Sequence, residues 1–572
     1  MKERFMKFFN ALVFFYLSPI FIFGFIFGNF VFADSEDKLL EIRKTNHPNY
    51  LRLPIDGNIT TIDPGLSYDM SSIELTEQLF LGLTGFERKG SNYVLAPELA
   101  LNWTIHENGT VYRFNLRKDV YWVSGITGQG LRSVTAHDIV WALRRNIDPK
   151  TETPYSSVLY ILKNAEDINT GKIKDISKLG VHALDDFTVE FQLNHPASYF
   201  LALTAMWIYR PLPKEAIDLH NDEWTNPECI QTNGPYMLHS WRKGRQLVLK
   251  KNNLFYDSKK VSIPEVRYNV VIESFAGLDM FLKNELDVVG DAYLRLPMEE
   301  TAKFIENNEY EGEFFMGPMF AVYSYFFNSL RSPTDNPLVR RAISYAFNRA
   351  MLVEHITRGN EKVANTFTPP MFLGYSEDDK DYGIGFNPHK AKELLEEAGY
   401  PDGKGFPELI LVHNLSETHV IIAKTFQEFL DHYLNIKLTV ISKEWDDYVK
   451  VITNKDKPNG PHMFQMGWST DYLDANNWLN DGYNYFQYFA GWNDDKIMKI
   501  VEKANNEQDS SARYKLFQEA EKYFTKEQAY ALPVYFLTAK YLVNPCIKNW
   551  YHMPIGGQHI PNWKIESIYL KK

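Results

Sequence analysis

Cysteine is almost absent from this 572-residue sequence, which contains only Cys229 and Cys546. Neither has a cysteine partner close by in the sequence, so no metal-binding or redox motif of the CxxC type is present. In an exported chain the two residues either form one disulfide or stay as thiols, and the sequence leaves both alternatives open.

The motifs that mark several large enzyme classes are also missing. Residues 125–130 have the glycines of a phosphate-binding loop without its lysine, and we predict a turn there. No GxSxG or HExxH segment occurs, and the 15 histidines are scattered. Carboxylate pairs are abundant but none stands out, so a secreted glycoside-acting enzyme stays as a rival interpretation. We expect a protein that is not an enzyme and that uses no cofactor and no metal.

An excess of positive charge is lacking as well, because the formal net charge is −11. Nucleic-acid binding needs a basic surface, so nucleic acid is excluded as a partner. The acidic balance suits a dispersed protein, and we expect a monomer. Apolar residues make up 45% of the chain, which is enough to fill several hydrophobic cores.

Residues 1–33 are predicted to be a secretory signal. Lys2, Arg4 and Lys7 precede an almost wholly apolar stretch over 8–32, and residues 31–33 offer a small-x-small cleavage site. The stretch is long enough to span a bilayer, so the alternative to cleavage is an uncleaved anchor. No cysteine lies near the cleavage point, which excludes a lipid anchor. The predicted location is the periplasm.

Local sequence patterns predict a mixed α/β fold. Residues 50–55 and 111–116 are predicted to be strands. Thr135 and Asp138 have the spacing of a capping box, which opens a helix over 139–146.

Two further helices are predicted to begin at the Asn-Pro pairs 336–337 and 387–388, and Gly399 is predicted to end the second. The most readable segment then alternates strand, helix and strand over 408–413, 417–434 and 436–442. Such a βαβ unit implies a parallel sheet with helices on its faces.

Several short blocks, in a shared order from about residue 52 to the C-terminus, carry a resemblance to a known family. They include TIDP, LAPELA, YRFNLRK, NGPY and GWSTDY, and they cover residues 61–64, 95–100, 112–118, 135–138, 145–151, 233–236, 336–342 and 467–472. The chain resembles family 5 of the extracellular solute-binding proteins, and within it the periplasmic oligopeptide-binding proteins of ATP-driven importers.

The resemblance implies a two-lobed, type II-like periplasmic binding protein with an extra inserted domain. Its ligand cleft lies between lobes that close by a hinge motion. Lobe one is implied to be split into residues 34–80, 214–317 and 540–572, with the inserted domain over 81–213. Lobe two is implied to span 318–539.

The resemblance also implies where a peptide binds. Asp471 matches the aspartate that pairs with the ligand amine, and inside a closed cleft such a pair is worth more than a surface pair. The alternative for Asp471 is an ordinary turn carboxylate. Backbone groups along the GWS segment would hold the peptide as an added strand, flanked by an early loop. These gripping residues are Gly467, Trp468 and Ser469, with Met70 and Ser71 in the loop.

Four more positions match the family's cleft. Tyr155 matches a tyrosine of the inserted domain, and Trp445 matches the aromatic wall of a side-chain pocket. Asn414 and His419 match a polar pair at the end of a strand and the start of its helix. His419 either meets a ligand carboxylate, with binding that strengthens toward a pH of about 5.5, or is a solvated histidine. Trp468 is either a cleft residue or ordinary core.

The chain departs from the family at the positions where relatives place cations for the ligand's C-terminus. Those positions hold Gln465, Ile452 and Thr357, the last beside Arg358. The expected function is capture of short peptides for the permease subunits of an importer in the inner membrane. The rivals are a same-family binder of a dipeptide, glutathione, haem, nickel or a sugar, the glycoside-acting enzyme, and a chaperone-like binder of unfolded chains.

Overall fold

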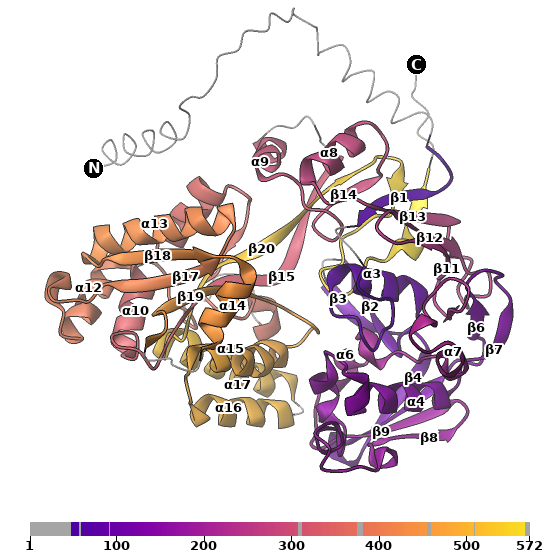
Figure 1. The fold of residues 1–572 in the computed structure, drawn as a ribbon. Helices are drawn as coiled ribbons and strands as arrows, with labels where there is room; N and C mark the ends of the chain where they lie inside the picture. The colour runs from indigo at the N-terminus through magenta and orange to yellow at the C-terminus, as the bar shows by residue number, and fades with distance from the viewer. Residues whose placement is uncertain are drawn as a thin grey trace, which may run out of the picture. The chain divides into compact units, whose positions relative to one another are not determined.

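The structure is a computed structural model, and the described part of the chain belongs to one unit (Figure 1). The described residues are 47–566, apart from 56–58, 91, 307–309, 311, 375–380, 455–458 and 508. The predicted signal therefore lies outside the described residues. Within the described part of the chain, no helix combines the length and the apolar character needed to cross a bilayer.

The first sheet has four strands in the order β1-β13-β12-β11, and β1 runs parallel to β13. Leu51, Leu53 and Ile55 of β1 are buried, and the strand predicted over 50–55 is confirmed. Helix α3 packs against β11. The elements are β1 (Leu51–Ile55), α3 (Met70–Leu79), β11 (Tyr236–Arg242), β12 (Gln246–Lys251) and β13 (Glu265–Val270).

A second four-stranded sheet, β4-β5-β9-β8, lies in the predicted inserted domain. Helix α4 begins with the predicted capping box, in which Thr135 and Asp138 each accept a hydrogen bond from the other's backbone N–H. The glycine-rich segment forms the predicted turn between β6 and β7. The elements are β4 (Ala100–His106), β5 (Val111–Leu116), β6 (Tyr121–Ser124), β7 (Gly130–Ser133), α4 (Ala136–Ile147), β8 (Val181–Asp185) and β9 (Thr188–Gln192).

The largest sheet has the order β14-β20-β15-β19-β17-β18, with β16 also paired to β20. Strands β17 and β18 are parallel and joined by α13, so the predicted βαβ unit is confirmed. The elements are β14 (Val288–Gly290), β15 (Phe314–Phe327), β16 (Lys362–Val363), β17 (Leu409–Asn414), α13 (Glu417–Leu434), β18 (Leu438–Lys443), β19 (Met463–Ser469) and β20 (Ala531–Val543).

Helices cover both faces of this sheet. Side chains alternate along a strand, and Leu411 of β17 joins one core with α10, α12 and α13 while Val412 joins the opposite core with α14 to α17. The predicted Asn-Pro helix starts are confirmed, and Gly399 follows α12 with φ of +93°. The helices are α10 (Pro337–Ala346), α12 (Pro388–Glu397), α14 (Trp445–Thr453), α15 (Tyr483–Ala490), α16 (Asp495–Asn506) and α17 (Ser510–Glu521).

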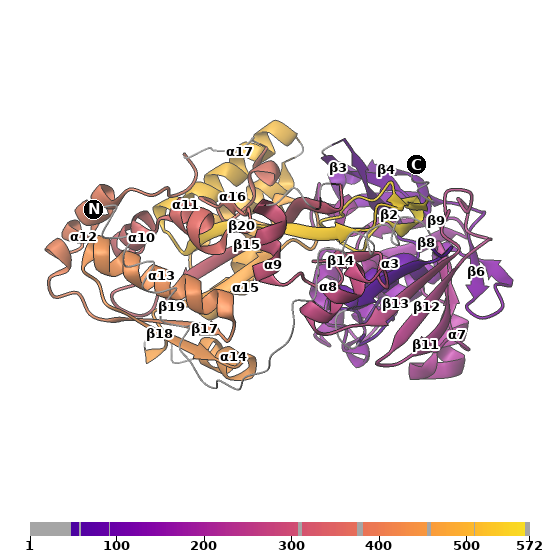
Figure 2. The same ribbon diagram turned by 90° about the horizontal axis from the view of Figure 1, so that it is seen from above.

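Strands β15 and β20 run side by side and are the longest strands of the described residues (Figure 2). Each crosses a predicted lobe boundary, at residues 317–318 and 539–540. Two strands shared between lobes are a natural hinge. The division of the chain at these and the other predicted boundaries stays a prediction.

Candidate functional site

The carboxyl ends of three parallel strands meet at one edge of the largest sheet, because β17 pairs in parallel with both β18 and β19. Asn414 is the last residue of β17, and His419 lies in the first turn of the helix that follows. Trp445 begins α14 two residues after β18 ends, and Ser469 ends β19. Ligands of open α/β sheets bind outside such carboxyl ends.

The last residues of β19 have one edge whose backbone groups pair with no other described strand. Along one side, β15 pairs with β19 as far as Ser469. Along the other side, β17 pairs only with Met463 and Phe464, and the Gln465 carbonyl accepts a hydrogen bond from the Tyr448 hydroxyl. Among the described residues, no strand pairs with 466–469 on that side. An extended ligand segment can add there by backbone hydrogen bonding.

Asp471 lies two residues after the end of β19 and is partly buried. Its backbone N–H donates to Asn477 Oδ1 at 3.0 Å, and its carboxylate accepts from Asn477 Nδ2 at 3.3 Å and from the Tyr155 hydroxyl at 3.4 Å. In the described part of the chain, no lysine or arginine forms an ion pair with it. Burial raises the pKa of the Asp471 carboxyl, and the hydrogen bonds from Asn477 and Tyr155 offset part of that rise. A partly desolvated carboxylate that pairs with none of the described cations suits a cationic ligand group.

Asn477 organises this segment and was not foreseen from the sequence. Its side chain is 0% exposed, and its Oδ1 also accepts from Trp468 Nε1 at 3.3 Å and from the Thr470 hydroxyl at 3.2 Å. Its Nδ2 also donates to Asp481 at 3.2 Å. Burial raises the pKa of Asp481 to about 6. No spacing rule marks Asn477, because its role arises only when the chain folds back on the GWSTD segment.

Aromatic contacts join the predicted inserted domain to the Asp471 segment. The Tyr155 ring packs edge-on against Trp207 with centroids 5.1 Å apart, which aims its hydroxyl at Asp471. Tyr199 stacks on Tyr472 at 6.0 Å. The structure thus brings Tyr155 and Asp471 together across about three hundred positions of sequence, as the resemblance implies.

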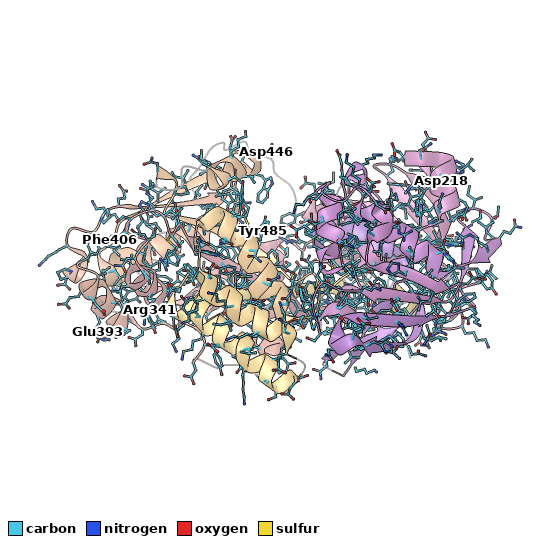
Figure 3. All side chains as sticks on the ribbon, turned by 90° about the horizontal axis from the view of Figure 1, so that it is seen from below. Asp218, Arg341, Glu393, Phe406, Asp446 and Tyr485 are labelled. Carbon is cyan, nitrogen blue, oxygen red and sulfur yellow. The ribbon has the colours of Figure 1, made fainter. Side chains whose placement is uncertain are left out.

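Trp468 is neither wholly core nor wholly exposed. Its ring packs against Tyr485 and Phe486 of α15 with centroids 5.6 and 5.7 Å away. Tyr485, labelled in Figure 3, is half-exposed and extends this aromatic surface. Trp445 is 56% exposed and tilted over Tyr448 at 5.8 Å, so its ring is available to a ligand.

His419 contacts other side chains of the protein, whereas one of the two alternatives for it was a solvated histidine. The Tyr323 hydroxyl lies 3.1 Å from its Nδ1, and its ring packs against His413 at 6.0 Å. Burial, together with smaller electrostatic contributions from His413 and Arg295, lowers the pKa of His419 to about 4. The imidazole of the ligand-free protein is therefore neutral at pH 5.5, which argues against a charged contact there, and the contact of His419 with a ligand stays a prediction.

Met70 and Ser71 do not lie in a loop, which corrects the expectation for them. They form the first turn of α3, because the Asp69 carboxylate accepts from the Ser72 N–H at 2.9 Å and caps the helix there. Met70 is 55% exposed at this helix start. Whether the two residues contact a ligand stays a prediction.

Cys229 and Cys546 are both described, and the structure does not join them to each other. Cys546 is buried near the C-terminal strands, whereas Cys229 is partly exposed. The structure therefore contains no disulfide between Cys229 and Cys546.

Comparison with known proteins identifies the fold and the family. The model of a family described as bacterial extracellular solute-binding proteins, family 5 middle, matches residues 94–488, which is more than half of the chain. The chain belongs to family 5 of the bacterial extracellular solute-binding proteins. Membership of family 5 makes it a binding protein and not an enzyme, as predicted.

Relatives within family 5 cover nearly the whole chain. The oligopeptide-binding protein OppA of Bacillus subtilis is 30% identical over 85% of this chain and 87% of its own length. The periplasmic OppA of Salmonella typhimurium is 28% identical over 90% and 91%.

Solved structures agree with the fold. A Borrelia burgdorferi periplasmic oligopeptide-binding protein superimposes with a TM-score of 0.72 at 27% identity, covering 90% of this chain and 99% of its own. The Escherichia coli murein tripeptide-binding protein MppA also gives 0.72, at 26% identity and with 91% and 99% covered. The predicted two-lobed α/β fold is confirmed.

Proposed function

We propose that this family 5 protein captures short peptides, holds their α-ammonium group on Asp471 and delivers them to the permease subunits of an ATP-driven importer. The observation that carries the proposal is the partly buried Asp471 carboxylate, which forms an ion pair with no lysine or arginine of the described residues and lies just beyond the unpaired edge of β19. A peptide supplies both complements, because its amine is positive and its backbone can pair as a strand.

The other predicted site residues have supporting roles in the proposed peptide binding. The segment Gly467–Ser469 would pair with the peptide backbone, and Tyr155 would help to orient the Asp471 carboxylate. Trp445, Trp468 and Tyr485 offer ring surfaces for peptide side chains of varied shape. Asn414 and His419 would supply neutral polar groups farther along the same sheet edge.

The names of relatives support the ligand class and the location. Several family 5 relatives are named for oligopeptides or dipeptides, and those of Salmonella typhimurium and Escherichia coli are named periplasmic. We place this protein in the periplasm as well. One Escherichia coli relative is named as a probable deoxycholate-binding protein. Deoxycholate has no amine, so a site built around Asp471 favours peptides over such an anion.

A pool of di- to hexapeptides is expected to stabilise the protein without being cleaved. Ligand that binds only the folded state adds roughly 2.7 kcal/mol to the free energy of unfolding when its free concentration is about a hundred times Kd. Thermal denaturation with and without the pool measures the gain, and chromatography of the pool after incubation tests for cleavage. Stabilisation by deoxycholate or a sugar, with none by peptides, contradicts the proposal.

Amidation of the peptide C-terminus is expected to change the binding free energy by only about 0–1 kcal/mol, the worth of a solvated charge contact. The three positions where relatives place cations are neutral here, and Arg358 already pairs with Glu306. Isothermal titration of one tripeptide as free acid and as amide measures the difference. His419→Ala should leave that difference unchanged from a pH of about 5.5 to about 8, because His419 is neutral throughout. A large loss on amidation would reveal a fixed cation at this end, and Arg295, whose charge reaches His419, is the first to test.

A further inference from the structure

A second hollow lies away from the Asp471 site and has the opposite charge. Its volume is about 650 Å³, within the range of small-molecule sites. Three distant parts of the chain line this open hollow: β2 (Thr84–Lys89), the loop between β12 and β13, and the segment around β21 (Ile547–Lys548) and β22 (Lys564–Ile565). None of its lining residues belongs to the predicted lobe two.

Cations dominate this basic hollow, although the chain as a whole is acidic. Its charged lining residues are Arg88, Lys259, Lys260 and Lys564, and its lining contains no carboxylate. Lys260 pairs with Asp257 at 2.7 Å. Within the described ranges, no carboxylate lies at ion-pair distance from the other three. The basic hollow therefore keeps most of its positive charge unneutralised.

The backbone pairing beside the basic hollow adds a like-charge contact. In the two-stranded ladder of β21 and β22, Lys548 stands directly opposite Lys564. Like charges at directly opposed positions destabilise a strand pair. An anion bound at the basic hollow would relieve that repulsion.

Two aromatic rings and three neutral donors complete the lining. Trp550 is fixed by the rings of Phe315 and Tyr541, with centroids 5.2 and 5.1 Å away. The Tyr551 hydroxyl accepts from Asn562 Nδ2 at 2.9 Å, and the Arg88 guanidinium lies 5.8 Å from the Tyr551 ring. The neutral donors are Ser262, Asn549 and Asn562.

We propose that the basic hollow binds a phosphate-bearing ring compound, with the phosphate on Arg88, Lys259 and Lys564 and the ring against Trp550 and Tyr551. Charge-assisted hydrogen bonds from several cations suit a multiply charged phosphate. Aromatic side chains suit the apolar face of a sugar or cyclitol ring. The same chemistry occurs in a free sugar phosphate and in the headgroup of a phosphoinositol lipid.

The test titrates the full-length protein with glucose 6-phosphate, inorganic phosphate and glucose at low ionic strength. Glucose 6-phosphate is expected to bind more tightly than inorganic phosphate, glucose is expected not to bind, and added salt should weaken the binding. Co-sedimentation with vesicles that contain phosphatidylinositol 4-phosphate, against phosphatidylcholine vesicles, separates a lipid headgroup from a free solute as the source.

Matched variants locate the site. Lys259→Gln with Lys564→Gln should weaken glucose 6-phosphate, or vesicle, binding by at least about tenfold, because two charged contacts are lost. Lys283→Gln with Lys303→Gln removes the same charge from exposed ion pairs elsewhere and should leave binding unchanged. Both double variants should bind peptides as the wild type does, so this test is independent of the Asp471 site. No binding of any phosphate probe, equal binding of inorganic phosphate and glucose 6-phosphate, or equal loss in the two double variants would overturn the proposal.

Discussion

Replacing Asp471 with asparagine is expected to weaken peptide binding by roughly 2–5 kcal/mol, which is a loss of about 30-fold or more. Asparagine keeps the shape of the side chain and removes the charge that meets the ligand's ammonium group. The folded protein should lose no stability, because desolvation disfavours the Asp471 charge and none of the described lysines and arginines forms an ion pair with it. Isothermal titration and thermal denaturation of the same preparations measure the two effects separately.

The pH dependence of binding gives an independent view of Asp471. Burial raises its pKa in the free protein, and only the ionised form pairs with an ammonium group. Affinity of the wild type should therefore fall as the pH is lowered from about 7 toward about 4.5, and that fall should be much smaller in Asp471→Asn.

The control is Asp446→Asn at the exposed start of α14, labelled in Figure 3, which removes an equal charge without touching the Asp471 segment. Equal weakening in the two variants, or no weakening in Asp471→Asn, rules out the proposed contact.

Replacing Asn477 with alanine is expected to lower the free energy of unfolding by about 3 kcal/mol. The change leaves the Trp468 Nε1–H and the Asp471 backbone N–H without their acceptor. It also removes hydrogen bonds that lower the pKa values of Asp471 and Asp481, so both carboxyls should titrate at higher pH and peptide affinity should fall. Urea denaturation measures the first effect and titration with peptide the second.

Asn484→Ala is the matched control for this variant. Asn484 lies on α15, is exposed and makes one long hydrogen bond to Asn480. Its replacement should change the free energy of unfolding by less than about 0.5 kcal/mol. If Asn477→Ala is as stable as Asn484→Ala, the hydrogen bonds around Asn477 do not hold the Asp471 segment in place.

Local signals in the sequence were sufficient to predict the βαβ unit and the positions where the helices start. The caps at Thr135, Asn336 and Asn387 act within one turn of their helices, so they can be read without knowledge of the tertiary structure. Strand β15 was not foreseen, because Phe314–Phe327 is an apolar and aromatic run without clear alternation. Its second half, residues 320–327, is buried on both faces of the sheet, and periodicity alone does not separate such a run from a buried helix.

The residues of the candidate site also divide into those that the sequence could predict and those that it could not. Asp471 and Tyr155 could be predicted because each lies in a short block that resembles the family. Asn477 could not be, because its five hydrogen bonds form only through tertiary packing. The neutral state of His419 also depends on its burial beside Tyr323, which no spacing in the sequence reveals.

The measurement that tests the central claim most directly is a titration of the wild type with one tripeptide and with its N-acetylated twin. The two ligands share every side chain and most of the backbone and differ in the charge that Asp471 would meet. We predict that acetylation weakens binding by about 30-fold or more, matching the effect of Asp471→Asn. Equal affinity for the two ligands would contradict the claim that the carboxylate of Asp471 holds the peptide amine.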